Sequence, residues 1–538
     1  MRKECFFSLF LFLLIACTSA EKKHEDKMIF RYNEYAGINS LDPAFSRSQS
    51  IIWACNQLYN GLVQLDSDLN VKPSIAKSWE ISEDGKSYIF HLRNDVYFHE
   101  HSLFESKEGR RLKASDVRYS LNRLRSSSLA APGAWVLKQV SQIETPDDFT
   151  VVIHLKESFP PFLGLLSMNY CAVLPAHLLE NSAYDFRSHP IGTGPFQFQY
   201  WKENVKLVFR KNSMYFEKEN GKQLPYLDAV SISFIPDRQS AFLEFLKGKH
   251  HFLSGIDASY KDELLNYSGE LRDKYKDELN MLSQAYLNTE YLGILQGEEQ
   301  PNEGLKNKKV RQAINCAFDR KEMVKYLRNN IGRAATAGFI PEGLPAFVDT
   351  AYNSYNPNKA LQLLEEAGYP NGKGLPEITI STSSDYLDFC EYIQGSLSKV
   401  GIAVAVDVGP PSTLRKQMSA SQLSFFRGSW IADYADAENY LSLFYSENFC
   451  PGGPNYTHFK NETYDSLYRV AIKETTVDKR IALYRKMDAM IMDEAVIVPL
   501  YYDRVLRFTH KNVEGLGSNG MNLLDIKRTR ITKDSEER

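Results

Sequence analysis

The sequence has little of what several common protein classes require. Its 538 residues include seven cysteines at wide spacings, with no CxxC or Cys/His pair of the kind that holds structural zinc. The 64 Lys and Arg residues do not outnumber the 67 Asp and Glu residues, so the basic excess that neutralises phosphates is missing. No repeat of fixed period is present, which excludes solenoids and propellers. We therefore expect no nucleic-acid partner and no disulfide framework.

Motifs of the common enzyme classes are missing as well. We find no GxSxG nucleophile elbow, no HExxH zinc helix and no GxxxxGK[ST] phosphate loop. The run Gly192-Thr193-Gly194-Pro195 favours a tight turn, because Pro195 has no amide to offer a phosphate and no Lys follows. Asp433 and Asp436 could act as general acid and base, but their spacing at a helix start is typical of capping. We expect no enzymatic activity and no cofactor.

Two histidine groups are the candidates for a metal site. His99 and His101 flank Glu100, and His250 adjoins His251. Neighbouring strand residues point to opposite faces, and no further ligand is apparent, so we expect no metal site.

The N-terminus has the features of a secretion signal. Arg2 and Lys3 precede an apolar run from Cys5 to Ile15, about half of the roughly 20 residues that a spanning helix needs. Leu14-Ile15-Ala16-Cys17 resembles the bacterial lipobox, in which the cysteine is acylated and becomes the new N-terminus. We predict that residues 1–17 are a lipoprotein signal peptide, that Cys17 carries the lipid, and that the protein is periplasmic or in the cell envelope, lipid-anchored to a bacterial membrane. A plain signal peptide is the alternative.

The rest of the chain mixes strands and helices. Alternation at Tyr88, Phe90 and Leu92, at Val151, Ile153 and Leu155, and from Ile402 to Val408 predicts half-buried strands. The spacing of Val310, Ala313, Ile314, Ala317 and Phe318 predicts a helix, and Asn356 as cap with Pro357 and a stop at Gly368 frames another. A third helix is expected from 478 to 494, followed by an apolar strand from 496 to 502. This order indicates an α/β protein of several lobes.

A set of short motifs, in order from end to end, resembles the peptide-binding proteins of ATP-binding-cassette importers, the group with oligopeptide-, dipeptide- and nickel-binding members. The motifs are Leu41-Asp42-Pro43, Leu58-Tyr59-Asn60-Gly61-Leu62-Val63, Pro73-Ser74-Ile75-Ala76-Lys77-Ser78-Trp79, Gly192-Thr193-Gly194-Pro195-Phe196, Pro225-Tyr226-Leu227-Asp228, Ala367-Gly368-Tyr369-Pro370 and Arg427-Gly428-Ser429-Trp430-Ile431-Ala432-Asp433-Tyr434.

The resemblance implies a two-lobed, hinged periplasmic-binding-protein fold that closes on its ligand, with an extra domain on the first lobe. By position, the first lobe takes residues 28–60, 189–283 and 503–526. The extra domain takes residues 61–188, and the second lobe takes 284–502. We expect a monomer that passes its ligand to the permease subunits of the importer.

The resemblance also implies a peptide site. Asp433 would hold the α-amino group of the ligand, Trp430 would pack on it, and the main chain of Arg427, Gly428 and Ser429 would pair with it as an added strand.

Further ligand contacts are expected elsewhere, from Phe45, Arg47, Ser48 and Tyr291. Arg47 stands near a position where some relatives have an acidic residue, and it could meet a carboxylate. A nickel complex, haem or a cell-wall peptide are the alternative ligands.

Overall fold

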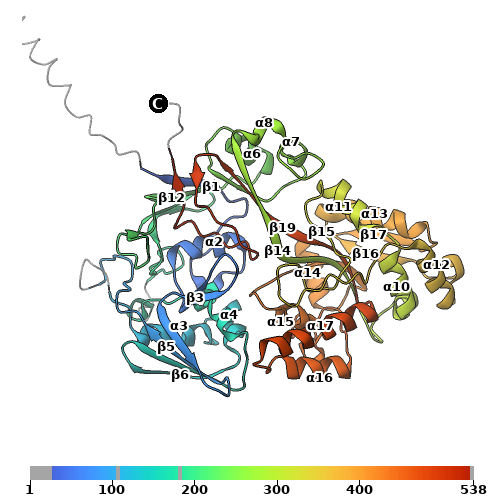
Figure 1. Ribbon diagram of the computed structural model, residues 1–538, viewed down its shortest axis with the longest axis horizontal. Helices are drawn as coiled ribbons and strands as arrows, with labels where there is room; N and C mark the ends of the chain where they lie inside the picture. The colour runs from blue at the N-terminus through green and yellow to red at the C-terminus, as the bar shows by residue number, and fades with distance from the viewer. Residues whose placement is uncertain (1–26, 105–109, 180–183, 533–538) are drawn as a thin grey trace, which may run out of the picture.

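The computed structural model describes residues 27–104, 110–179 and 184–532. Two groups of elements lie side by side and are joined by two long strands (Figure 1). We call them the first lobe, which contains β1, β8, β9, β12 and β13, and the second lobe, which contains β15 to β18. The mixed α/β composition predicted from the sequence is confirmed. The predicted signal segment and Cys17 lie outside the described residues.

One eleven-stranded sheet runs through both lobes. Its path is β17-β16-β18-β14-β19-β13-β1-β12-β9-β8, and β15 pairs with β19 off this path. The strands are β1 (Ile29–Asn33), β8 (Phe196–Lys202), β9 (Lys206–Lys211), β12 (Ala229–Ser233), β13 (Phe252–Ser254), β14 (Leu279–Ile294), β15 (Arg333–Ala334), β16 (Ile378–Thr382), β17 (Val404–Val408), β18 (Phe425–Ile431) and β19 (Ile497–His510).

The strands β14 and β19 connect the lobes. At one end β19 pairs with β13 of the first lobe, and at the other end β14 pairs with β18 of the second. Their mutual pairing is irregular between Ala285 and Thr289, midway along β14. The apolar strand expected from 496 to 502 is thus longer than predicted, because its second half enters the first lobe. The predicted lobe boundaries between residues 283 and 284 and between 502 and 503 fall inside these two strands. The residue ranges assigned to the lobes from the sequence stay a prediction.

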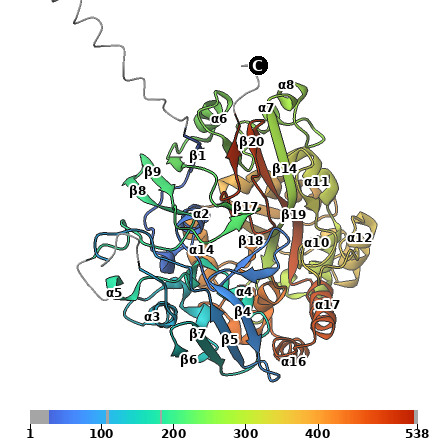
Figure 2. The ribbon, with the colours of Figure 1, turned by 60° about the vertical axis from the view of Figure 1, so that its left-hand side comes forward.

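A second sheet packs on the first lobe. It is antiparallel, in the order β4 (Ala76–Ile81), β5 (Ser87–Leu92), β7 (Thr150–Leu155), β6 (Val140–Asp147), beside α3 (Ala114–Leu124), α4 (Phe162–Leu166) and α5 (Ala176–Leu179) (Figure 2). Tyr88, Phe90 and Leu92 are buried on one face of β5, as their alternation predicts. The apolar core of this sheet is continuous with that of the first lobe around α2 (Gln49–Leu58). The first lobe also carries α6 (Arg238–Leu246), α7 (Lys261–Leu264) and α8 (Asp273–Lys276).

Helices cover the sheet of the second lobe, and the predicted ones are present. Asn356 caps α12 by accepting a hydrogen bond from Lys359 N at 2.9 Å. The helix α10 ends at Cys316, earlier than its apolar spacing suggests, although Ala317 and Phe318 are buried. The helices are α9 (Glu303–Lys306), α10 (Lys308–Cys316), α11 (Arg320–Arg328), α12 (Pro357–Glu366), α13 (Leu387–Ser398), α14 (Pro411–Ser419), α15 (Glu438–Leu441), α16 (Glu462–Ala471) and α17 (Val477–Glu494).

The glycine-rich run is a turn packed on α2. A Cβ at Gly192 would lie 2.1 Å from Leu58 O, so only glycine permits this approach. His99 belongs to the same packing, since its Nδ1 accepts a hydrogen bond from Gly192 N and its Nε2 lies 3.1 Å from Gly194 O. The five cysteines of the described ranges, Cys55, Cys171, Cys316, Cys390 and Cys450, are buried free thiols.

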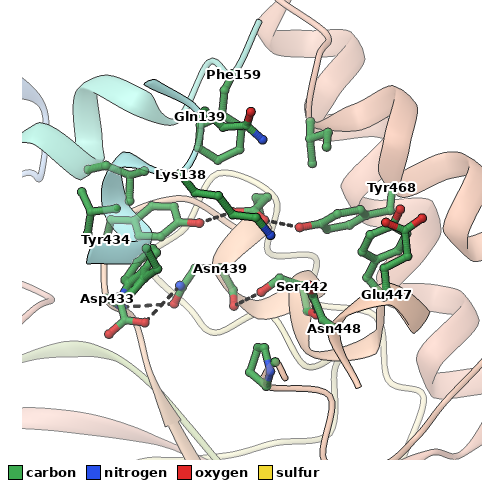
Figure 3. Close-up of a pocket in the computed structure, with 18 of the residues that line it drawn as sticks. Lys138, Gln139, Phe159, Asp433, Tyr434, Asn439, Ser442, Glu447, Asn448 and Tyr468 are labelled. Carbon is green, nitrogen blue, oxygen red and sulfur yellow. Dashed lines mark hydrogen bonds between the residues drawn. The ribbon is translucent and has the colours of Figure 1, made fainter. Parts of the chain in front are cut away.

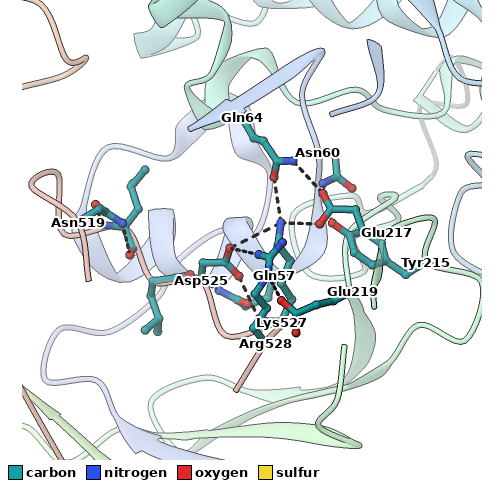
Figure 4. Close-up of polar contacts among 12 residues, drawn as sticks. Gln57, Asn60, Gln64, Tyr215, Glu217, Glu219, Asn519, Asp525, Lys527 and Arg528 are labelled. Atoms are coloured by element: carbon teal, nitrogen blue, oxygen red, sulfur yellow. Dashed lines mark hydrogen bonds and ion pairs between the residues drawn. The ribbon is translucent and has the colours of Figure 1, made fainter. Parts of the chain in front are cut away.

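The C-terminal segment is fixed to the first lobe by a buried ion pair (Figure 4). Lys527 Nζ lies 2.9 Å from Glu217 Oε2 and 2.9 Å from Gln64 Oε1, and its side chain is 7% exposed. Arg528 Nε pairs with Glu219 Oε1 at 2.9 Å. A buried ammonium is tolerated only with such partners, so this cluster specifies where the end of the chain docks.

Candidate functional site

Two cavities lie between the lobes. The large cavity has a volume of ≈ 720 Å³ and is lined by Lys138, Gln139, Glu157 and Phe159 on one side and by Trp430, Asp433, Tyr434, Asn439, Glu447 and Tyr468 on the other (Figure 3). The small cavity, of ≈ 230 Å³, is lined by Arg47, Gln49, Asn56, Ser167, Asn169, Tyr170, Ile431, Ala432, Asp433 and Met521, among others. Of the predicted site residues, Asp433 alone lines both of these cavities.

The position of Asp433 is set by Asn439 of α15. Asn439 Oδ1 accepts hydrogen bonds from Asp433 N at 3.1 Å and from Trp430 Nε1 at 3.0 Å. Asn439 Nδ2 lies 3.4 Å from Asp433 Oδ2 (Figure 3). One amide therefore holds both the indole and the carboxylate.

The carboxylate of Asp433 is an anion without a cation. No Lys, Arg or His in the described part of the chain forms an ion pair with it, and Asn439 is its only hydrogen-bond donor there. It reaches solvent through the cavities, yet the surrounding protein desolvates it and raises its pKa above the ordinary value, while the hydrogen bond from Asn439 opposes that rise. A positively charged group placed here would replace the lost hydration and gain a charge-assisted hydrogen bond.

The strand β18, which leads to Asp433, has an open edge. Ala432 N donates to Leu287 O and Leu295 N donates to Ser424 O, each at 2.9 Å, so even-numbered residues of β18 exchange hydrogen bonds with β14. The main-chain groups of the odd-numbered residues point to the other edge. There β16 pairs only at Phe426 and ends at Thr382. Beyond that point Ser429 and Ile431 face no strand among the described residues.

Behind this edge, the side chains of Arg427 and Ser429 contact Glu290 of β14. Arg427 Nη2 pairs with Glu290 Oε2, and Ser429 Oγ donates to Glu290 Oε1 at 2.9 Å. The guanidinium of Arg427 also lies over the ring of Tyr386, 3.2 Å from its centroid. These contacts fix the side chains of the strand. Gly428 is one of the even-numbered residues that pair with β14, so Ser429 is the one of the three predicted strand residues that lies on the open edge beyond β16.

The sequence of residues 70–449, well over half of the chain, matches the model of the bacterial extracellular solute-binding proteins, family 5 Middle. The chain belongs to this family. The members of this family are solute-binding proteins, and one of the relatives below is an ABC transporter-associated periplasmic binding protein.

Known relatives cover nearly the whole chain. A glutathione-binding protein, GsiB of Salmonella paratyphi A, is 26% identical over 89% of this chain and 90% of its own length. Heme-binding protein A of Haemophilus influenzae is 28% identical, covering 82% and 81%. Among solved structures, the periplasmic binding protein DppA of Helicobacter pylori in complex with the peptide STSA superposes with a TM-score of 0.77 at 26% identity, covering 94% and 99%. The two-lobed fold predicted from the resemblance is confirmed.

None of the helices in residues 27–104, 110–179 and 184–532 combines the length and the apolar character needed to cross a bilayer.

The structure brings some of the other predicted residues to the cleft and not others. Arg47 is exposed and lines the small cavity. Phe45 is partly buried against the first-lobe core, and Ser48 Oγ lies 3.0 Å from Ser50 Oγ at the start of α2. Tyr291 is 3% exposed and packs on Gly428 and Phe339, so it supports β18 from within the second lobe and lines neither cavity.

Sequence reasoning missed three features of the site. Asn439 carries no signal in the sequence, because its side chain reaches Asp433 only through the turn between them. Glu438 is buried between the hydroxyls of Tyr434 and Tyr468, which both donate to it (Figure 3). Lys473 pairs with Glu157 at 2.6 Å across the large cavity, joining the second lobe to the sheet packed on the first.

Proposed function

We propose that this protein is the lipid-anchored substrate-binding subunit of an ATP-binding-cassette importer and that it captures short peptides by their α-amino group. The proposal rests on the surroundings of Asp433. Its carboxylate lies between the lobes, is desolvated by the protein, accepts a hydrogen bond from Asn439 and has no counter-cation among the described residues. An α-ammonium supplies the missing charge. The peptide of the Helicobacter pylori complex is a ligand of this class.

The open edge of β18 supports the same ligand. A peptide whose first residue meets Asp433 can run along Ser429 and Ile431 and exchange main-chain hydrogen bonds with them, while Trp430 packs on it. Pairing through the main chain does not depend on the ligand's side chains. The two cavities beside Asp433 then receive those side chains, and bridging water fills the remaining space.

Arg47 is proposed to take a carboxylate of the ligand. It lines the small cavity together with Asp433, so the cleft presents a cation and an anion on opposite lobes. Phe45 and Ser48 flank it in the sequence and belong to the same segment. A short zwitterionic peptide matches this pair of charges.

Nickel complexes, haem and cell-wall peptides are the alternative ligands. The Haemophilus influenzae relative is a heme-binding protein. The unpaired carboxylate of Asp433 favours a ligand with an ammonium group, which a free or cell-wall peptide with an α-amino group provides.

The test compares free and N-acetylated tripeptides. Residues Thr18 to Arg538 would be purified, stripped of ligand under mild denaturant and refolded, and the melting temperature measured with each set. Ligand at about 100 times its Kd stabilises the folded state by about 2.7 kcal/mol, a shift of a few degrees. We expect free peptides to raise the melting temperature, acetylated peptides to leave it unchanged, and Asp433→Asn to abolish the difference.

Equal shifts with both sets would mean that Asp433 does not bind an α-ammonium. No shift with either set would reject peptides as the ligand, and haem and nickel complexes would then be tested in the same assay. The lipid anchor is tested separately, by the mass of the N-terminal fragment of the full chain expressed in bacteria, with Cys17→Ser as the control.

A further inference from the structure

A second group of reactive side chains lies in the second lobe, apart from Asp433. The loop that follows Asn448 carries Cys450, and the thiol Sγ lies 3.3 Å from His458 Nε2. His458 Nδ1 lies 2.8 Å from Glu299 Oε2. Ser421 Oγ lies 3.0 Å from the sulfur and 2.8 Å from His458 Nε2. The peptide site as proposed uses none of these side chains.

The geometry matches that of an activated nucleophile, in which a base contacts the nucleophile and a third group orients the base. Because the carboxylate of Glu299 accepts a hydrogen bond from Nδ1–H, a neutral His458 has its lone pair on Nε2. This atom lies 3.3 Å from the thiol sulfur and 3.3 Å from the main-chain oxygen of Cys450. The ring of His458 is further fixed by Phe449, stacked on it at a centroid distance of 4.5 Å. His458 is thus oriented to accept the proton of Cys450.

The group lies just beneath the surface. Glu299 is 62% exposed and the side chain of His458 is 12% exposed, whereas Cys450 is 5% exposed. The same loop lines the large cavity through Asn448, Gly452 and Gly453. Cys450 itself lies one turn of this loop away from the cavity wall, between Asn448 and Gly452.

We propose that Cys450 is a site of thiol–disulfide exchange with low-molecular-weight disulfides, with His458 as its base and Glu299 as the positioning residue. The thiol proton moves to His458 Nε2, and the thiolate attacks one sulfur of the small disulfide. A new bond forms from Cys450 Sγ, and the old sulfur–sulfur bond breaks with its electron pair on the leaving sulfur. That thiolate takes the proton from His458, so Cys450 is oxidised to a mixed disulfide and one thiol is released.

The other four thiols provide an internal control. Cys55, Cys171, Cys316 and Cys390 are buried, as Cys450 is, and burial raises the pKa of each of these four. None of them has a histidine within hydrogen-bond distance among the described residues. Since thiolate is the attacking species, these four should react only when the protein unfolds.

The experiment uses dithiodipyridine, a small uncharged disulfide whose released thiol is coloured. In the native protein from Thr18 to Arg538 we expect one thiol to react quickly, and Cys450→Ser to remove that phase. Cys390→Ser, the matched control, should leave it unchanged. A fast phase that survives Cys450→Ser, or the absence of any fast phase before unfolding, would overturn the proposal.

The role of His458 is tested by the pH profile. At pH 6.5 we expect His458→Asn to slow the reaction by at least about tenfold. The difference in rate between the variant and the wild type should narrow above pH 9, where hydroxide ionises thiols without a base from the protein. Glu299→Gln, a substitution of similar size at a position that is 62% exposed, should shift the pH profile in the same direction. Wild-type rates at pH 6.5 in both variants, with unchanged melting temperatures, would show a merely structural hydrogen bond.

Discussion

At the scale of single residues, the binding of an ammonium depends on the ionised form of Asp433. Its pKa is raised by desolvation, so the carboxylate takes up a proton at a higher pH than an ordinary Asp does. We expect peptide affinity to be greatest at neutral pH and to fall as the pH is lowered through this raised pKa. Titration calorimetry from pH 7 to pH 4 measures this fall. Asp433→Asn should weaken binding at neutral pH and flatten the profile; an unchanged slope would assign the titration to another group.

We expect the loss of the Asn439 side chain to weaken peptide binding almost as much as the loss of the Asp433 carboxylate that it holds. Asn439→Ala removes the acceptor of Trp430 Nε1 and Asp433 N, and should weaken peptide binding by about 1 to 2 kcal/mol, roughly five- to thirtyfold. Ser442→Ala is the matched control, since Ser442 lines the same cavity and its hydroxyl donates to Asn439 O at 3.0 Å without touching Asp433 or Trp430 among the described residues. Equal affinities of the two variants would contradict the role given to Asn439.

At the scale of elements, the packing of β18 against β14 requires the glycine at position 428. A Cβ at Gly428 would lie 2.6 Å from Cζ of Tyr291, whose ring is already packed against Phe339. Gly428→Ala should therefore lower the free energy of unfolding by about 1 to 3 kcal/mol, as overpacking does. Urea unfolding measures the change.

Gly395 in α13 gives the matched control for this substitution. Nothing lies within 4 Å of a Cβ built there, so Gly395→Ala should stabilise the helix by roughly 0.5 to 1 kcal/mol. If both variants had the same stability, the close approach of Tyr291 to β18 would be wrong.

At the scale of the whole molecule, two buried carboxyl groups connect stability to pH. Burial raises the pKa of Glu438 and of Asp488 to about 7, whereas each titrates near 4 in an unfolded chain. The folded state thus binds more protons between these values. Its extra stability from these groups is complete below about pH 4 and is lost as the pH rises through about 7, by at most about 1.4 kcal/mol per pH unit for each group.

We expect Glu438→Gln with Asp488→Asn to reduce the fall in the free energy of unfolding between pH 5 and pH 8. Urea unfolding at unit intervals of pH measures it, and Glu298→Gln, at an exposed position, serves as the control. A double variant whose profile parallels that of the wild type would show that neither group is buried in the folded state as described.

Much of the fold could be predicted from the sequence because its signals are local. The cap at Asn356 and Pro357 and the apolar alternation of β5 and β7 each depend on residues close together in the chain. The end of β19 could not be predicted in this way. Its last residues extend because β13 pairs with them, and that contact spans some 250 residues of chain.

The sequence by itself determined the family, the element types and the importance of the segment from Arg427 to Asp433, since motifs and periodicity are properties of the chain alone. Only the tertiary structure decided what surrounds that segment. Asn439 reaches Asp433 across a turn, and His458 lies against Cys450 across a loop. Lys473 meets Glu157 from a distant part of the chain, because packing brings the two lobes together. Glu438 is buried, and Asp433 is open to the cleft but desolvated by the protein around it. The raised pKa of each carboxyl group follows from that packing and has no counterpart in the linear sequence.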